Sequence, residues 1–282
     1  MPPRLRPATD ADLPAIRALR REVGWQVSAW ALRDAMHAPH TAFLALEDKG
    51  RLVAIGSGIA YGRLGVVGNM IVASDRRREG LGSRVLRAVL DFLEGEGADR
   101  IELFATPDGR PLYEQFGFEP MPPGVLIDLD LARVPRTDAS ALNVRAATTA
   151  DLDAIAAYDL PRFGGDRSAI LGNAVNDPDR PSYLADRDGA VIGYAVARPA
   201  DGRIGPWLAD DIPTANALLS AITGLRLRAD FSAHPTHENA LGRAWLTGLG
   251  GHVRRTDGRM GFGPHLPRRM ELIYGNVVGA LG

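Results

Sequence analysis

The sequence contains no cysteine. This absence excludes disulfide bonds, a thiolate nucleophile, and zinc or iron–sulfur sites that depend on cysteine ligands. Acidic and basic residues nearly balance, 34 against 33, so nucleic acid and anionic membranes are not expected partners. The six histidines include two pairs at i, i+3 spacing, but neither pair has a third ligand at the spacing of a known motif. We therefore expect no metal site.

Long hydrophobic runs are also missing. No apolar stretch approaches the roughly 20 residues that cross a bilayer, so no membrane association is expected. Residues 1–6 read MPPRLR and lack the hydrophobic core of a secretory signal. These absences predict a cytoplasmic protein. Lysine is nearly absent as well: Lys49 is the only one, and the other 32 basic residues are arginines, which suit phosphate recognition.

What is present is enough apolar sequence for more than one core. The chain has 282 residues, 45% of them hydrophobic, a length that predicts two domains or one large domain. Residues 5–16 align with residues 144–155 at an offset of 139, and eight of the twelve positions are identical. In each copy a short strand leads into Thr-x-x-Asp, which predicts N-caps at Thr9 and Thr148 with Asp12 and Asp151 in the first helical turn. The repeat indicates two copies of one domain.

Strand and helix patterns are mixed along the first copy. The stretch 81–94 places Val85, Leu86, Val89 and Leu93 on one face, which is typical of an amphipathic helix. The mixture fits neither a helix bundle nor a β-sandwich. We expect helices at 10–22, 27–36, 81–94 and 110–115, and strands at 5–7, 41–47, 52–61, 66–73 and 100–104, near 118 and at 125–129.

A basic, glycine-containing turn precedes the helix at 81–94. Arg76, Arg77 and Arg78 lie just before Gly80 and Gly82. Glycines let a ligand approach the backbone closely, and the N–H groups and dipole of a helix start favour an anion. The pattern therefore predicts a phosphate site, although no lysine-bearing P-loop and no Gly-x-Gly-x-x-Gly fingerprint is present.

Two motifs carry a resemblance to a known family. The run 77–82, RREGLG, resembles the acetyl-CoA pyrophosphate loop of the GNAT superfamily of N-acetyltransferases, and residues 111–118, PLYEQFGF, are similar to its later Leu-Tyr-x-x-x-Gly-Phe motif. The resemblance implies an α/β (α+β) fold of two GNAT-like domains. Each would have a mixed, mostly antiparallel central sheet with a splayed strand pair and flanking helices. The expected parts are a catalytic domain at 1–132, a linker at 133–141, a degenerate domain at 142–264 and a tail at 265–282.

The resemblance also implies residue roles. Tyr113 matches the family's general acid, which protonates the departing CoA thiolate, and a phenol with a pKa near 10 suits that task. Strand backbone would pair with the pantetheine arm, and the amides of residues 78–83 would hold the pyrophosphate. The expected acetyl-CoA-binding residues are Met70, Ile71, Val72, Arg77, Arg78, Gly80, Leu81, Gly82, Ser83 and Thr106. Thr106 is a departure, because relatives often have Asn at this position.

The acceptor side is less defined. Trp25, Tyr61 and Asn69 are expected to line it, while core packing remains the alternative for the two aromatic residues. The strand segment 66–70, VVGNM, has no carboxylate where many relatives carry one. The general base is therefore unidentified, and deprotonation through water or by a residue of the second copy are both open.

The second copy has lost the expected cofactor features. Its strand 203–209 is followed by Asp210 and Asp211, whose charges would repel a pyrophosphate. Leu246 aligns with Tyr113, while Asn239 takes the position of Thr106. We interpret residues 142–264 as a pseudo-acetyltransferase domain that keeps the fold without cofactor binding or catalysis.

Two further segments have open roles. The loop 158–167, YDLPRFGGDR, either shapes the acceptor site or is a Gly-Gly turn in which Asp166 caps the next helix. The tail contains the apolar run 270–279, which predicts packing on a domain or on a partner subunit and adds a homodimer to the expected partners.

The sequence thus predicts an acetyl-CoA-dependent N-acetyltransferase that acts in a ternary complex without a covalent acyl-enzyme. The acceptor would be a primary amine of a small molecule or peptide. One alternative is a tandem enzyme similar to mycothiol synthase, which acetylates an amino sugar–cysteine conjugate. The other is a non-catalytic acyl-CoA-binding sensor.

Overall fold

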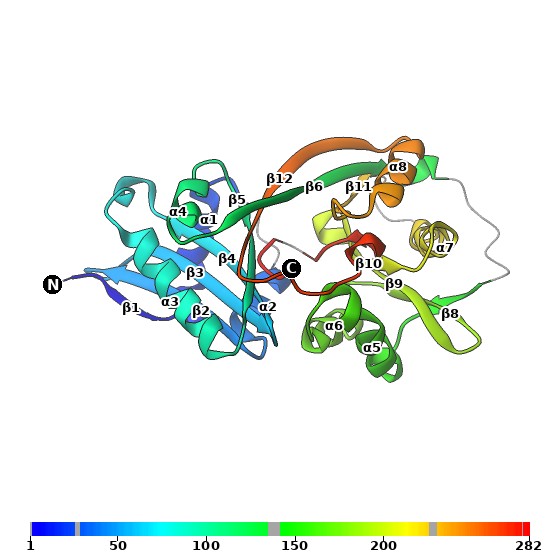
Figure 1. The fold of residues 1–282 in the computed structure, drawn as a ribbon, viewed down its shortest axis with the longest axis horizontal. Coiled ribbons are helices and arrows are strands. Elements are labelled where there is room, and N and C mark those ends of the chain that lie inside the picture. Colours follow the sequence, from blue (N-terminus) through cyan, green and yellow to red (C-terminus); the bar gives the residue numbers. More distant parts are fainter. Residues whose placement is uncertain (1, 26–28, 135–141, 226–229, 278) are drawn as a thin grey trace. The chain divides into compact units, whose positions relative to one another are not determined.

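The computed structural model describes residues 2–25, 29–134, 142–225, 230–277 and 279–282. The chain divides into two compact units (Figure 1). Unit 1 comprises residues 1–121, 259–265 and 278–282, and unit 2 comprises residues 122–258 and 266–277. Within the described residues, no helix is long and apolar enough to cross a membrane, and no group of three or more His, Asp or Glu side chains could hold a metal ion.

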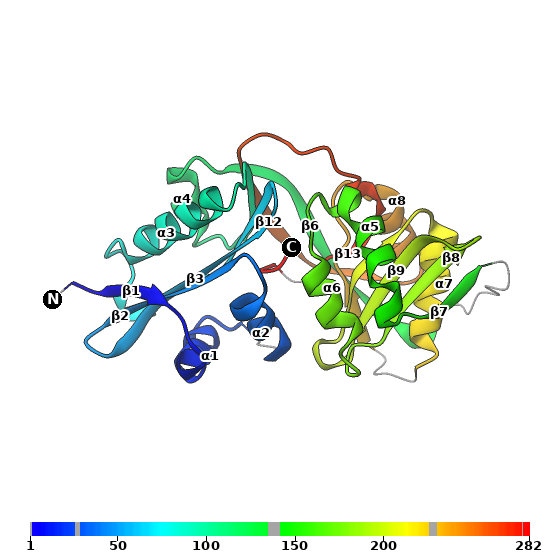
Figure 2. The ribbon, with the colours of Figure 1, turned by 90° about the horizontal axis from the view of Figure 1, so that it is seen from below.

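Unit 1 is a mixed sheet with helices on both faces. Strands β1 to β4 pair antiparallel in sequence order, and β4 and β5 run parallel. Figure 2 shows α3 and α4 on one face of this sheet and α1 and α2 on the other. Its elements are β1 (Arg4–Pro7), α1 (Leu13–Glu22), α2 (Ala29–His37), β2 (Thr41–Asp48), β3 (Arg51–Tyr61), β4 (Leu64–Val72), α3 (Leu81–Gly95), β5 (Arg100–Ala105) and α4 (Arg110–Gln115).

The apolar face predicted for the helix at 81–94 builds the core of unit 1. All four of its predicted residues are buried in one cluster with sheet residues such as Val53 and Leu103. Gly56 and Gly58 allow the close approach, because a Cβ atom at these positions would lie 2.6 Å from Val85 and 2.8 Å from Val89. Burial of this helix face against the sheet stabilises unit 1 through the hydrophobic effect.

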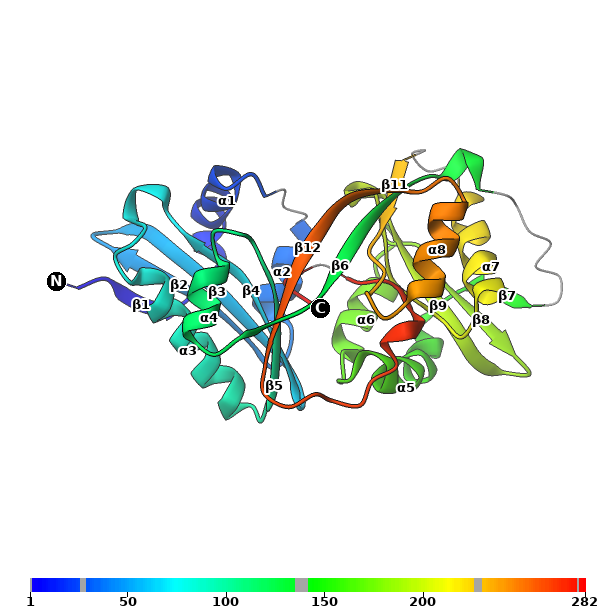
Figure 3. The same cartoon turned by 45° about the horizontal axis from the view of Figure 1, so that its top comes forward.

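Unit 2 repeats the arrangement. Strands β7 to β10 pair antiparallel, and β10 and β11 run parallel. Figure 3 shows α5 and α6 on one face of the sheet and α7 and α8 on the other. Its elements are β7 (Asn143–Ala146), α5 (Leu152–Phe163), α6 (Ser168–Val175), β8 (Ser182–Arg187), β9 (Ala190–Arg198), β10 (Arg203–Ala209), α7 (Ile212–Thr223), β11 (Asp230–Ala233), α8 (Ala240–Gly248) and β13 (Ile273–Gly275).

The predicted fold class is confirmed, and most predicted elements lie within two or three residues of the observed ones. Residues 10–12 form a 3-10 turn before α1 rather than its first turn. The strands expected near 118 and at 125–129 are one strand, β6 (Glu119–Asp130). The first residues of the helix expected at 27–36 lie outside the described residues, as do positions 135–141 of the expected linker.

The unit boundaries differ from the expected domain boundaries because the two copies exchange their last strands. From Pro122 onward β6 belongs to unit 2, where it pairs with β11, although it ends the first repeat. The last part of β12 (His252–Phe262) belongs to unit 1 beside β5, although it ends the second repeat. There the Phe262 ring lies 5.8 Å from the Phe118 ring. Which strands pair is set by the tertiary structure, so the sequence repeat alone did not predict the exchange.

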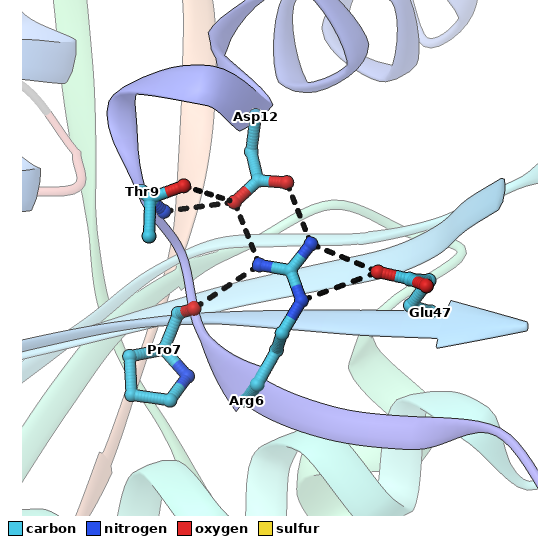
Figure 4. A network of polar contacts seen from close by, with 5 residues as sticks. All are labelled: Arg6, Pro7, Thr9, Asp12 and Glu47. Atoms are coloured by element: carbon cyan, nitrogen blue, oxygen red, sulfur yellow. Dashed lines mark hydrogen bonds and ion pairs between the residues drawn. The ribbon is translucent and has the colours of Figure 1, made fainter. Parts of the chain in front are cut away.

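The capping network predicted from the repeat is present in both copies. In Figure 4 the Asp12 carboxylate accepts hydrogen bonds from the Thr9 backbone N–H at 2.8 Å and the Thr9 hydroxyl at 3.1 Å. Arg6 of β1 donates to Asp12 and also to Glu47 of β2. At the offset of 139, Arg145, Thr148 and Asp151 repeat the pattern. The network ties the first strand of each copy to its first helix.

This network leads to a stability prediction. The Arg6 guanidinium lowers the pKa of Asp12 from 3.8 to about 2. Because the folded-state pKa is the lower one, the carboxylate stabilises the fold above pH 4, and this contribution is lost as the pH falls toward 2. We expect Asp12→Asn to lower the free energy of unfolding at pH 7 by about 1–2 kcal/mol. Thermal unfolding at pH 7 and pH 3 measures the loss, which should be smaller at pH 3 because the Asp12 contribution is then partly lost. Asp10→Asn, at a largely exposed carboxylate, is the matched control, and an equal loss in both variants contradicts the argument.

Candidate active site

Strands β4 and β5 are paired along only part of their length and then separate. Their parallel pairing covers only Leu64–Val67 of β4. On its other edge β4 stays paired with β3, with a bulge at Asn69, whose φ angle is +53°. Among the described residues no strand pairs with the β5-facing edge of β4 beyond Val67. The predicted splayed strand pair is therefore present, and Met70, Ile71 and Val72 lie along its open edge, where backbone groups can pair with a ligand.

The start of α3 is built to receive an anion. Gly80 is the N-cap in a left-handed conformation, with φ +76°, and no side chain caps the helix. The first N–H groups of a helix have no partner within it, so those of Leu81, Gly82 and Ser83 are available to a ligand. A Cβ atom on Gly82 would lie 3.3 Å from Leu112 and 3.4 Å from Val72. The backbone is therefore both uncapped and close to its neighbours at this point.

The three arginines of the turn differ in their surroundings. Arg76 pairs with Asp48 at 2.8 Å and Glu79 at 2.9 Å, so its charge is already neutralised by the protein. Arg77 lies 3.7 Å from Asp108 at the surface. Arg78 is exposed, adopts φ +65°, and makes no ion pair with a described residue. Arg77 and Arg78 remain the arginines suited to a phosphate.

Tyr113 lies on α4, whose start follows the end of β5. Its side chain is buried, with 7% of its surface exposed, and its ring meets that of Phe118 edge-on at 6.0 Å. Burial raises its pKa to about 12. The phenol therefore keeps its proton at neutral pH and can donate it, whereas it is unsuited to act as a base.

Thr106 is exposed in the turn between β5 and α4. Its hydroxyl oxygen accepts a hydrogen bond from the Gly109 N–H at 3.2 Å, immediately before the helix that carries Tyr113. Through this contact Thr106 holds the backbone of the turn that leads into α4.

The predicted acceptor residues Trp25 and Asn69 are connected through a residue that sequence reasoning missed. The Asn69 side chain is buried, donates to the Ser57 hydroxyl at 2.9 Å and accepts from the Arg20 guanidinium. Arg20, on α1, also stacks on the Trp25 ring at 5.5 Å. Burial lowers the pKa of Arg20. A single arginine within an amphipathic, arginine-rich helix gave no signal that it points inward.

Tyr61, the third predicted acceptor residue, is buried at the end of β3. Its hydroxyl donates to the backbone carbonyl of Leu281 at 2.8 Å. The phenol therefore bonds to the C-terminal segment. The two residues are 220 positions apart in the chain, so no local sequence pattern predicts this contact.

In unit 2 strand β13 occupies the gap that corresponds to the one between β4 and β5 in unit 1. Strand β10 pairs with β11 only at Arg203 and Ile204, and β13 then pairs with β10 at Trp207 and Leu208. On its other side this segment bonds to the chain after β11, since the Asn276 N–H donates to the His234 carbonyl at 3.1 Å.

The turn after β10 has lost the anion site as well. Eight residues, 73–80, separate β4 from α3, whereas only Asp210 and Asp211 separate β10 from α7. Asp211 caps α7, because its carboxylate accepts from the Thr214 N–H at 2.8 Å. Asp210 pairs with Arg162 at 2.7 Å. A carboxylate of the chain thus lies where an uncapped helix would bind a phosphate.

Two other positions of unit 2, those that correspond to Thr106 and Tyr113, also differ from unit 1. The Asn239 side chain donates to the Ile273 carbonyl of β13 at 3.1 Å and caps α8. Leu246, the counterpart of Tyr113, is fully buried in the core. The amide at the position of Thr106 therefore holds the internal strand, and an apolar side chain takes the position of Tyr113.

The segment 158–167, expected as a loop, comprises the end of α5 and a short turn before α6, and it contributes a buried ion pair. Arg167 and Asp159 pair at 2.8 Å with side chains 0% and 1% exposed, and the Tyr194 hydroxyl also donates to Asp159. Asp166 accepts from the Ser168 N–H at 2.9 Å at the start of α6. Asp166 thus lies one residue before the N-cap, Arg167, and accepts from the first N–H of the helix, and the ion pair joins α5 to the start of α6.

Each copy matches a GNAT acetyltransferase model in comparisons with known proteins. Residues 11–118 match the family described as "Acetyltransferase (GNAT) family", and residues 155–275 match the "Acetyltransferase (GNAT) domain". This chain belongs to the GNAT family of acetyltransferases and carries two GNAT domains in tandem. The resemblance inferred from the two sequence motifs is confirmed.

A curated relative is similar in sequence, and two solved structures share the fold. The uncharacterized N-acetyltransferase YitH of Bacillus subtilis is 32% identical over 168 residues, which cover 58% of this chain and 57% of that protein. The chain thus matches little more than half the length of this relative. A proposed acetyltransferase from Pyrococcus horikoshii has 19% identity and a TM-score of 0.84, covering 99% of this chain and 96% of that one. A tandem GNAT protein from the clavulanic acid biosynthesis pathway has 17% identity and a TM-score of 0.64, covering 93% and 99%. At these identities the two structures show a shared fold.

Proposed function

We propose that the chain is an acetyl-CoA-dependent N-acetyltransferase with one active site, in unit 1, acting on a primary amine. The observation that carries the proposal is the contrast between the two copies. Unit 1 combines an open β4 edge, an uncapped helix start at Gly80 and a protonated Tyr113. Unit 2 fills the equivalent strand gap with β13 and caps the equivalent helix with Asp211.

The residues of unit 1 suit the cosubstrate. The N–H groups at the start of α3 would hold the pyrophosphate, with Arg77 and Arg78 adding positive charge. The open edge of β4 would pair with the amides of the pantetheine arm and orient the thioester. The bound cosubstrate supplies an activated acetyl group.

In the transfer, the amine nitrogen forms a bond to the acetyl carbon as the carbon–sulfur bond breaks. Tyr113 donates its hydroxyl proton to the leaving thiolate. N–H groups of the open β4 edge stabilise the negative charge that develops on the carbonyl oxygen. The acceptor must arrive as the neutral amine; the proton that it loses once the bond has formed passes to water, from which the Tyr113 phenolate regains a proton. The acetyl group moves directly from the thioester to the amine, so no cysteine nucleophile is required.

Thiol release from acetyl-CoA across a panel of primary amines tests this function. We expect acetyl-CoA turnover that depends on the added amine and rises with pH as the acceptor loses its proton. Equal thiol release with and without amine contradicts N-acetyl transfer. Tight acetyl-CoA binding with no turnover on any amine of the panel favours the acyl-CoA sensor instead.

A further inference from the structure

The C-terminal residues Gly279, Ala280 and Leu281 pack into unit 1 beside the candidate active site. A Cβ atom on Gly68 would lie 2.5 Å from the Cα atom of Ala280, so only a glycine on β4 permits this approach. A Cβ atom on Gly279 would lie 3.4 Å from the Phe104 ring of β5. Leu281 is fully buried. The segment therefore crosses from β5 to β4 near the point where the two strands part.

The face of the sheet on which this segment lies follows from strand periodicity. Side chains alternate along a strand, so Ser57 and Tyr61 of β3 point to the same face. Ser57 accepts from Asn69, which in turn accepts from Arg20 of α1, while Tyr61 donates to the Leu281 carbonyl. The tail and α1 therefore share one face, opposite the face that packs on α3.

We propose that residues 279–281 form one wall of the acceptor site and restrict it to small primary amines. The proposal rests on the proposed function and names its substrate class. Gly68, against which Ala280 packs, directly precedes Asn69, which Arg20 holds from α1. Chain backbone thus occupies the sheet surface next to the open β4 edge. An extended peptide needs a clear sheet surface or groove along which to lie, whereas a compact amine needs only a pocket.

The segment that forms this wall follows directly from β13 of the second copy. The chain that fills the strand gap of unit 2 as β13 continues, three residues after Asn276, into the segment that lines unit 1. Gly205 permits the anchoring, because a Cβ atom there would lie 2.1 Å from the Asn276 carbonyl oxygen. In this proposal the degenerate copy holds the tail that sets the acceptor specificity of the active one.

Acceptor kinetics on the full chain test the proposal. The probes are ethanolamine, glucosamine and a lysine-containing dodecapeptide, each with saturating acetyl-CoA. For the unaltered protein we expect kcat/KM at least tenfold higher for the better compact amine than for the peptide. Deletion of residues 278–282 should reduce this ratio at least tenfold, through the acceptor KM, and leave the Kd of acetyl-CoA within twofold. Tyr61→Phe, which removes one hydrogen bond to the tail, should shift the ratio in the same direction by a smaller factor.

Tyr183→Phe, a half-buried position of the second copy, is the matched control and should leave every parameter unchanged. Thermal unfolding verifies that the Tyr61 variant is folded if the deletion is not. Peptide turnover as efficient as that of the compact amines in the unaltered protein overturns the proposal, as does an unchanged acceptor ratio in both altered chains. Absence of turnover with any amine overturns the proposed function and the inference together. Turnover without the expected acceptor preference overturns the inference alone, so the two failures are distinguishable.

Discussion

Calorimetric titration should show one acetyl-CoA bound per chain, and Gly82→Glu should abolish this binding. The substitution places a carboxylate in the first turn of α3, where the N–H groups would hold the pyrophosphate, and its Cβ atom would lie 3.3 Å from Leu112. The lost space and the added negative charge both lower the affinity for acetyl-CoA. We expect affinity to fall at least 100-fold, about 2.7 kcal/mol.

Gly95→Glu is the matched control for this titration. Gly95 ends the same helix, and a Cβ atom there would meet nothing within 4 Å. The control should bind acetyl-CoA like the unaltered protein, which separates a local effect at the site from a general effect on α3. Two equivalent sites per chain, or tight binding by the Gly82→Glu variant, contradict the assignment of a single site to the start of α3.

Replacing Tyr113 by phenylalanine is expected to lower kcat by about 10²–10⁴-fold, the usual contribution of a positioned general acid. The Kd of acetyl-CoA should change little, because phenylalanine keeps the ring that packs edge-on against Phe118. Initial rates at saturating acetyl-CoA and amine measure the effect. A kcat within threefold of the unaltered protein would mean that the tyrosine only packs in the core.

The pH profile provides a second readout for the same residue. Burial raises the pKa of Tyr113 to about 12, so the acid remains protonated throughout the range in which acceptor amines lose their protons. The rate of the unaltered protein should therefore rise with pH through the pKa of the acceptor amine and show no decline between pH 7 and 10. A decline centred near pH 8 would assign the proton donor to another group.

Local chemistry was readable without the structure wherever neighbouring residues in the chain carry it. The capping network of Thr9 and Asp12, the apolar face of α3 and the glycine turn at Gly80 each depend on residues within a few positions of one another. The replacement of the glycine turn by Asp210 and Asp211 in the second copy was equally visible. Periodicity and spacing report such features because helices and turns are built from local backbone geometry.

The partners of Arg20 and Tyr61 could not be predicted in the same way. Arg20 meets Asn69, 49 residues along the chain, and Tyr61 meets Leu281, 220 residues along the chain. Tyr61 was expected to line the acceptor side or to pack in the core, and its hydroxyl donates to the tail. Which side chain reaches which depends on how strands align in the sheet, and a single sequence contains no record of that alignment.

The sequence by itself determined that the protein has two GNAT domains, that the first contains the glycine turn before α3 and Tyr113, and that the second has neither. These properties lie in contiguous motifs. Tertiary structure alone decided that the copies exchange β6 and β12, that β13 fills the strand gap of unit 2, and that residues 279–281 reach β4. Such long-range contacts arise because open strand edges and apolar tails must be paired and buried, and only the complete fold selects which segment meets which edge.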